Sequence, residues 1–338
     1  MQISPNSEYQ NLIEQIGDLL HKGREQAAKA VNTLLVQTYW QIGRYIVDFE
    51  QGGKAKAEYG SELLDKLSKD LTLGYGKGFS RSNLTYMRKF YLSFPKSETL
   101  SHKLSWSHYF EILKAEDKLE INFYTKQCEK DNWSVRELKR QMKSMLFHRL
   151  ALSKDKQGIL ELSQKGLEIQ QPKDIIKDPY VLEFLDIPQQ HQYLESELEA
   201  KLIQNLQSFL LELGKGFAFI GRQYRISIGG RHFFVDLVFY HRILKCFVLI
   251  DLKRGEIEHQ DIGQMNLYLN YFRKEENTEG DNEPIGIVLG AYKDQILIEY
   301  AIENISNQLF VSKYQLYLPD KQKLAAELNK LLENQNDE

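Results

Sequence analysis

Two short apolar runs in the second half of the chain each contain one aspartate. Asp236 lies within HFFVDLVFY, and fifteen residues later Asp251 lies within CFVLIDLK, two positions before Lys253. Both runs are rich in β-branched and aromatic residues, which predicts buried β-strands. A carboxylate in such a strand is costly unless it is paired or binds a cation. Because side chains alternate along a strand, Asp251 and Lys253 share one face.

Two carboxylates and a lysine on neighbouring strands can hold a hard divalent cation beside a phosphate group. The alternative is a buried, salt-bridged cluster without a ligand, and the spacing alone does not separate the two. The elements around the two strands decide which other side chains join these three.

The second half of the chain predicts a unit of mixed helices and strands over residues 193–338. The expected elements are a helix over 193–213, a strand over 217–228, the two acid-bearing strands, a helix over 256–272, a central strand over 285–289, a helix over 294–305, an edge strand over 311–318 and a helix from Asp320. Gly229-Gly230 predicts a hairpin turn between the first two strands.

The first 150 residues predict helices only. Apolar stripes indicate two helices over 8–50, then helices over 58–72, from Ser80 to about Leu92, from about Ser105, over 117–130, and from the capping box Ser134–Glu137 to about Arg149. Residues 151–192 contain three of the seven prolines and predict a connector, with one short helix over 178–185 that packs in part on the second domain.

The charge of the chain is divided unevenly. Residues 1–150 hold 23 Lys and Arg against 18 Asp and Glu, whereas the remainder holds 21 against 29. A basic first half favours phosphate contacts there. The candidates are Arg81, Arg88 and Lys89, on a helix that follows a glycine-rich turn as in a helix-turn-helix, and the stripe of Arg136, Lys139, Arg140 and Lys143. The alternative is an ordinary solvated surface.

No apolar run approaches the length of a membrane span, and the first residues lack the pattern of a signal peptide. Cys128 and Cys246 are the only cysteines, which argues against a disulfide framework or a zinc site and favours a reducing cytoplasm.

The pattern of Asp236 followed by Asp251-Leu252-Lys253 resembles that of the PD-(D/E)XK nucleases. Four segments around it narrow the resemblance to the YhcG-type members of that group: GKGFAFIGRQYRI, DLVFYHRILKC, LIDLKRGE and GQMNLYL. The resemblance implies two domains: an all-α N-terminal domain over 1–150, and an α/β restriction-endonuclease-like domain with a mixed sheet over 193–338. It covers most of the chain.

The resemblance also implies a metal-dependent phosphodiesterase. Asp236, Asp251 and the backbone carbonyl of Leu252 would bind Mg²⁺, with Mn²⁺ as a substitute, and Lys253 would act either as a base or as a cation that stabilises charge. By position, the family's helix glutamate matches Glu199, which the resemblance would add to the metal ligands. Gln264 and Tyr268 match the Gln-x-x-x-Tyr pattern of its RecB-like branch and lie four apart on one helix face.

Several side chains near these strands are weaker candidates. Gln223 and Tyr240 are second-tier members of the site, and His241 and His259 are expected to be structural or exposed. Glu195, Glu197 and Glu212 compete with Glu199 for the helix position.

We expect a DNA nuclease, with two alternatives: a DNA-binding or assembly protein that uses the nuclease fold as a scaffold, and an RNA nuclease. The helix over 31–49 is apolar over a wide arc, which predicts a homodimer through the N-terminal helices. The alternative is a monomer in which the other N-terminal helices cover this one.

Overall fold

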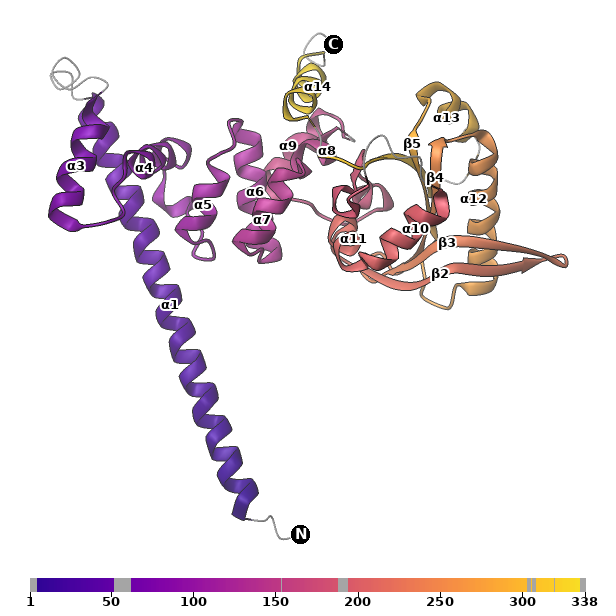
Figure 1. The fold of residues 1–338 in the computed structure, drawn as a ribbon, viewed down its shortest axis with the longest axis horizontal. Coiled ribbons are helices and arrows are strands. Elements are labelled where there is room, and N and C mark those ends of the chain that lie inside the picture. Colours follow the sequence, from indigo (N-terminus) through magenta and orange to yellow (C-terminus); the bar gives the residue numbers. More distant parts are fainter. Residues whose placement is uncertain are drawn as a thin grey trace. The chain divides into compact units, whose positions relative to one another are not determined.

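The computed structural model describes residues 5–51, 62–152, 154–187, 194–302, 305, 308–318 and 320–334. By its internal contacts the chain divides into two units, Met1–Lys139 and Arg140–Glu338 (Figure 1). The start of the helix expected over 58–72, and Pro188, lie outside the described residues. No helix in the described ranges is both long enough and apolar enough to span a membrane.

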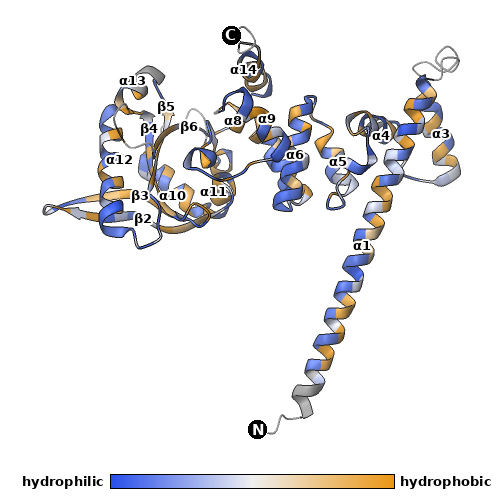
Figure 2. Ribbon diagram, turned by 180° about the vertical axis from the view of Figure 1, so that it is seen from behind, coloured by the Kyte–Doolittle hydropathy of each residue, from blue (hydrophilic) through white to orange (hydrophobic). Residues whose placement is uncertain are grey.

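The first unit is built on one long helix, α1 (Pro5–Gln51), of 47 residues. The expectation of two helices over 8–50 is therefore wrong. The physical reason is that no proline follows Pro5 in this stretch, and a glycine inside a helix only weakens it. Every residue from Asn11 to Asn32 is exposed, and Figure 2 shows apolar residues recurring along this arm.

The C-terminal part of α1 packs against α4 (Arg81–Ser93). Gly43 permits the close approach, because a Cβ at this position would lie 2.0 Å from the carbonyl oxygen of Met87. Trp40 adds a hydrogen bond of 2.6 Å from its indole nitrogen to the carbonyl of Phe94. Trp40, Ile46 and Val47 are buried by this packing, so the apolar arc of 31–49 is partly covered within the chain.

The other helices of this unit are α3 (Leu63–Tyr75), α5 (Trp106–Ile112), α6 (Lys118–Asp131) and the start of α7 (Val135–Lys143). The expected cap at Ser80 is confirmed, since its side chain accepts a hydrogen bond from the amide of Asn83. Ser105 and His108 form a capping box at the start of α5, so His108 caps a helix.

The last predicted helix of the N-terminal half is broken. α7 ends at Lys143, and α8 (Leu146–Ala151) begins after Met145, which adopts a left-handed φ of 57°. The break turns Arg149 into the interior of the second unit, where its guanidinium is fully buried against Glu212. Burial of this pair favours the break over the straight helix that the capping box predicts.

The sheet of the second unit has the order β1-β6-β5-β4-β3-β2. Its strands are β1 (Tyr180–Val181), β2 (Phe217–Ile228), β3 (Arg231–His241), β4 (Cys246–Glu256), β5 (Ile285–Tyr292) and β6 (Leu309–Gln315). β2, β3 and β4 pair antiparallel, and the other pairs are parallel, which confirms the mixed sheet and the central place of 285–289.

Two expectations at the far side of this sheet are wrong. The segment 178–185 forms β1 and a short 3₁₀ turn rather than a helix, and β1 pairs with β6, so the strand expected at the edge is interior. Residues 151–192 also contain α9 (Lys156–Lys165). β1 was not expected because two residues after a proline give no periodic pattern.

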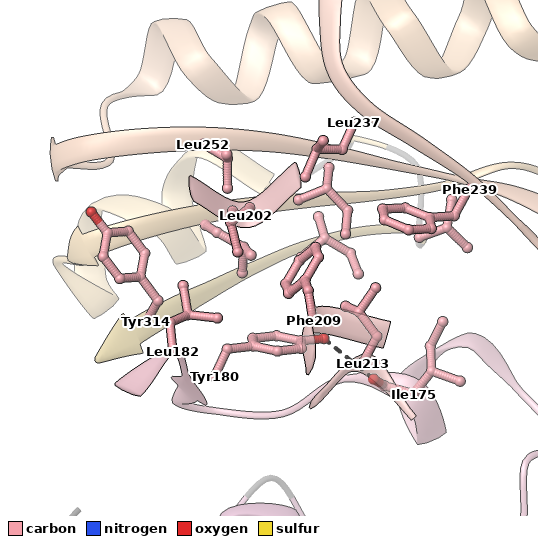
Figure 3. Packing of buried hydrophobic residues seen from close by; sticks show 14 of the residues in the cluster. Ile175, Tyr180, Leu182, Leu202, Phe209, Leu213, Leu237, Phe239, Leu252 and Tyr314 are labelled. Carbon is pink, nitrogen blue, oxygen red and sulfur yellow. Dashed lines mark hydrogen bonds between the residues drawn. The ribbon is translucent and has the colours of Figure 1, made fainter. Parts of the chain in front are cut away.

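Helices cover both faces of the sheet. One face packs on α10 (Glu195–Gln204) and α11 (Leu206–Leu213), with Leu202, Phe209 and Leu252 among the core residues shown in Figure 3. The single helix expected over 193–213 is interrupted at Asn205. The other face packs on α12 (His259–Tyr271) and α13 (Gln295–Ile302), and α14 (Lys321–Asn334) follows β6.

Candidate active site where strands β3 and β4 separate

The regular pairing of β3 with β4 stops just before their aspartates. The last paired residues are Leu237 and Ile250. Beyond them the backbone N–H of Leu252 donates to Oδ2 of Asp236 at 2.8 Å. A side-chain bond thus replaces the next bond of the ladder, and it holds the carboxylate of Asp236 against the strand that carries Asp251.

Asp251 is buried beside Lys253. Its carboxylate is shielded almost completely, the residue being 2% exposed, and Lys253 Nζ lies 2.9 Å from Asp251 Oδ2 and 3.5 Å from Asp261 Oδ1. Burial and the negative charge of Asp236 raise the pKa of Asp251 to about 7, against the opposing effect of Lys253. Burial by itself would lower the pKa of Lys253, but its carboxylate neighbours raise it overall.

Glu199 reaches the site through Gln223. The side-chain amide of Gln223 donates to Glu199 Oε2 at 2.6 Å and to Asp236 Oδ1 at 3.0 Å. Burial raises the pKa of the Glu199 carboxyl; the hydrogen bond from Gln223 opposes this, and the charge of Asp236 adds to it. The backbone of Gln223 has φ of 46°, which residues other than glycine seldom adopt.

Gln264 and Tyr268 meet on the inner face of α12. Gln264 donates to the hydroxyl of Tyr268, and that hydroxyl donates to the carbonyl of Phe234 at 3.0 Å. Burial raises the pKa of Tyr268, and the charges of Asp251 and Asp236 raise it further. The six side chains predicted for catalysis, Asp236, Asp251, Lys253, Glu199, Gln264 and Tyr268, therefore surround one region of the second unit.

Three members of this region were missed or underrated from the sequence. Asp261 lies beside Lys253, Glu195 accepts a hydrogen bond from the amide of Arg254 at 3.0 Å, and Gln223 links two acids. Helical spacing could have indicated two of them, because Asp261 is three residues before Gln264 and Glu195 is four before Glu199.

The donor atoms fit a hard divalent cation. Across the part of the chain that the structure describes, no three His, Cys, Asp or Glu side chains converge as a ready-made metal cluster. Magnesium needs only one or two protein carboxylates and keeps several waters. Asp236 and Asp251 supply two. Burial raises the pKa of Asp251 and repulsion from Asp236 adds to it, and a bound cation would relieve that repulsion.

The other weaker candidates are either structural or exposed. The hydroxyl of Tyr240 donates to Asp281 at 2.6 Å, and His241 is buried between two backbone groups. His259 is exposed at the start of α12, and Glu212 is committed to its ion pair with Arg149. Glu197 caps the start of α10.

The cations predicted to contact DNA on α4 all have partners inside the first unit. Arg81 pairs with Asp65 at 3.1 Å, and Arg88 binds both carboxylate oxygens of Glu50, at 2.7 and 2.9 Å. Lys89 donates to two carbonyls near the end of α5. These contacts reduce what the three side chains can offer to an external phosphate.

The α7 stripe is more open. Arg136, Lys139 and Lys143 are exposed. Lys139 also lies 3.3 Å from Glu111, and the half-buried Arg140 donates to the carbonyl of Ser208 at 3.4 Å. The stripe therefore presents two cations, Arg136 and Lys143, for which the described residues include no salt-bridge partner.

A mixed sheet with one acid on a strand, and Asp-x-Lys on its neighbour, defines the PD-(D/E)XK nuclease fold. The family described as the YhcG PDDEXK nuclease domain matches residues 173–331, and the DUF1016 N-terminal domain matches residues 15–149. The YhcG protein of Escherichia coli strain K12 is 40% identical over 352 residues, which cover 95% of this chain and 93% of that protein. The chain belongs to the YhcG family of PD-(D/E)XK nuclease proteins.

Two solved structures match part of the chain. A repair endonuclease from Pyrococcus abyssi is 20% identical over 39% of this chain, with a TM-score of 0.28, and an EndoMS complex with double-stranded DNA is 20% identical over 40%, with a TM-score of 0.27. The match spans about half the length of each of those chains.

Proposed function

We propose that this protein is a Mg²⁺-dependent nuclease that hydrolyses phosphodiester bonds in DNA, with Mn²⁺ able to substitute. The observation that carries the proposal is the placement of Asp236 and Asp251, which the amide of Leu252 holds together beside Lys253. One of the two acids has a pKa raised by burial and repulsion, and a hard divalent cation is the ligand that such a pair favours.

In this proposal, Asp236, Asp251 and the carbonyl of Leu252 hold the cation. When bound, the ion activates water and offsets the negative charge of the phosphate. Lys253 acts as a cation toward the phosphate rather than as a base, because its acidic neighbours keep it protonated. The linked side chains of Glu199 and Gln223 orient water beside Asp236. The unusual φ of Gln223 supports this role, since strained backbone often marks functional sites.

The test is cleavage by the purified full chain of supercoiled, linear, single-stranded and branched DNA in Mg²⁺, beside Asp236→Ala and Asp251→Ala. We expect cleavage by the natural chain, and none above background by either variant, with DNA affinity kept because these acids hold the ion. Normal cleavage by both variants would contradict the assignment of Asp236 and Asp251 to a metal site. Matched RNA substrates decide between DNA and RNA, and an inactive natural chain would favour the scaffold alternative.

We also propose that the helical domain contributes to DNA binding through α7. The exposed positions of Arg136 and Lys143, on a helix that also carries Lys139 and Arg140, support this. Phosphate contacts of this kind add affinity without sequence preference.

A homodimer through α1 is the third element of the proposal. The exposed arm carries apolar or small residues three and four apart at Tyr9, Ile13, Ile16, Leu20, Gly23, Ala27, Ala30 and Leu34, which is the spacing of a coiled-coil seam. Tyr9, Ile13, Ile16, Leu20 and Leu34 are each about half exposed or more. The proposed contact therefore lies N-terminal to most of the 31–49 segment, whose buried face α4 already covers.

A further inference from the structure

The β2–β3 hairpin has two unlike faces. One face is apolar and packs into the core beside α12, through Tyr224, Ile226, Ile228, Phe233 and Val235. Side chains alternate along each strand, so the residues between these point to the opposite side. That side carries Gln223, Arg225 and Ser227 from β2, and His232, Phe234 and Asp236 from β3. The hairpin projects past the rest of the second unit in both Figure 1 and Figure 2.

Cross-strand contacts confirm that these side chains share one surface, which we call the hairpin polar face. Arg225 Nη2 lies 2.9 Å from Nε2 of His232, and Ser227 Oγ lies 3.0 Å from the other ring nitrogen. At the base of the hairpin, Gln223 contacts Asp236 at 3.0 Å. The hairpin polar face thus continues without interruption from a catalytic carboxylate toward the turn at Gly229-Gly230.

The charge of the hairpin is opposite to that of the unit that carries it. From Phe217 to His241 there are three arginines and one acid, Asp236, although acids outnumber bases 29 to 21 after residue 150. Arg225 and Arg231 are exposed, and within the described ranges neither forms a salt bridge with a carboxylate. On α4, by contrast, Arg81 and Arg88 are paired with acids.

The hairpin polar face also carries an exposed aromatic ring. Phe234 is 47% exposed and faces Arg225 across the strands. Its own carbonyl accepts the hydroxyl of Tyr268, so the backbone at this position is fixed to the site. An exposed ring beside an arginine is a suitable surface for a nucleotide, whose base stacks while its phosphate is neutralised.

We propose that the hairpin polar face binds the phosphodiester backbone of the substrate and leads it to Asp236 and Asp251. The inference deepens the proposed nuclease function and depends on it. Four residues of extended strand separate Asp236 from His232, a distance of about 13 Å. That length of duplex carries roughly eight phosphate charges, which is ample for contacts by Arg225 at the middle of the face. Arg231 pairs with Ile228 and so starts on the other side of the strand, but it is exposed next to the Gly229-Gly230 turn, where a nucleic acid that passes the tip of the hairpin can reach it.

The experiment compares the full chain with the variant Arg225→Gln/Arg231→Gln and with a matched control, Arg242→Gln/Lys245→Gln. The control removes the same charge from the exposed turn at the other end of β3. Affinity for labelled duplex DNA, single-stranded DNA and duplex RNA is measured by fluorescence anisotropy in EDTA, over a series of salt concentrations. Thermal unfolding verifies that all the variants are folded.

We expect the hairpin variant to bind at least tenfold more weakly and to lose about two units of the salt-dependence slope, because each phosphate contact contributes about 0.9. Its KM should rise while kcat stays near that of the natural chain. Arg225→Lys/Arg231→Lys should recover most of the slope, and the control should leave it unchanged. The nucleic acid that shows the largest loss identifies the substrate class.

Unchanged affinity and slope in the hairpin variant would overturn the inference, and so would an equal loss in the control. If the natural chain still cleaves in that case, the proposed function stands without the hairpin. A natural chain that neither binds nor cleaves any of the probes would overturn both.

Discussion

Asp236 and Leu252 are joined by a hydrogen bond of 2.8 Å from the backbone amide of one strand to the side chain of the next. The other oxygen of Asp236 accepts a hydrogen bond from Gln223, so both oxygens are fixed by the protein. The orientation of this acid is set by the fold before any ligand binds, which is how precise sites are built.

The burial of Asp251 makes stability depend on pH. Its pKa is raised from 3.8 to about 7, so between these values the folded chain keeps a proton that the unfolded chain has lost. Stability from this group therefore falls as pH rises through that window. Asp251→Asn should unfold at a higher temperature than the natural chain at pH 8 in EDTA, and the difference should shrink toward pH 4. Mg²⁺ should stabilise the natural chain only. Parallel pH curves for the two proteins would contradict this account.

Lys253 is expected to act through its charge. Lys253→Ala should lose nearly all cleavage, whereas Lys253→Arg should retain a measurable part, because the guanidinium stays positive although its shape differs. Single-turnover cleavage rates of the natural chain and the two variants, measured across a range of pH, test this expectation. An arginine variant as inactive as the alanine variant would favour a base role for Lys253.

The Arg149–Glu212 pair should be essential to the second unit. Both side chains are fully buried. Arg149 also binds the carbonyls of Ser144 and Pro179, and Glu212 accepts from the amide of Val181. Glu212→Leu leaves a buried cation unpaired and should cost about 3–5 kcal/mol in urea unfolding. Arg149→Met/Glu212→Leu should be less destabilised than Glu212→Leu; a double variant that is worse by the sum of both singles would argue against coupling.

Changing all four cations of the α7 stripe to alanine should weaken DNA binding similarly for every sequence and flatten its salt dependence. The matched control removes four exposed lysines of the first unit, Lys66, Lys69, Lys77 and Lys96. Equal effects of the two variants would show a general effect of charge. The α7 stripe would then be an ordinary solvated surface rather than a DNA-binding one.

The α1 arm should set the oligomeric state. Light scattering of the natural chain should give a dimer mass at tens of micromolar, and Ile13→Lys/Leu20→Lys should give a monomer, because charges in the seam oppose pairing. Asn11→Lys/Asp18→Lys changes the other side of the same helix and should remain dimeric. A monomeric natural chain contradicts the proposal.

The acid-bearing strands could be predicted because short apolar runs and the Gly229-Gly230 turn are local signals. Gln264 and Tyr268 were found through the resemblance to the family's Gln-x-x-x-Tyr pattern, and their spacing of four residues places them on one helix face. The link that Gln223 makes between Glu199 and Asp236 could not be predicted, because it depends on one left-handed backbone angle. The partners of Lys89 could not be predicted either, because they are carbonyls 24 and 26 residues away in sequence. The break after α7 depends on the burial of Arg149 against a residue 63 positions later, which no local pattern reveals.

Strand β1 has a consequence for how this family can be rearranged during evolution. Tyr180 and Val181 pair with Tyr314 and Gln315, so the segment before the acid-bearing strands closes the sheet beside the last one. Exchange of the helical domain at any junction after Val181 would expose the edge of β6, and open strand edges promote aggregation. Recombination that preserves a stable nuclease unit is therefore confined to the stretch upstream of Tyr180.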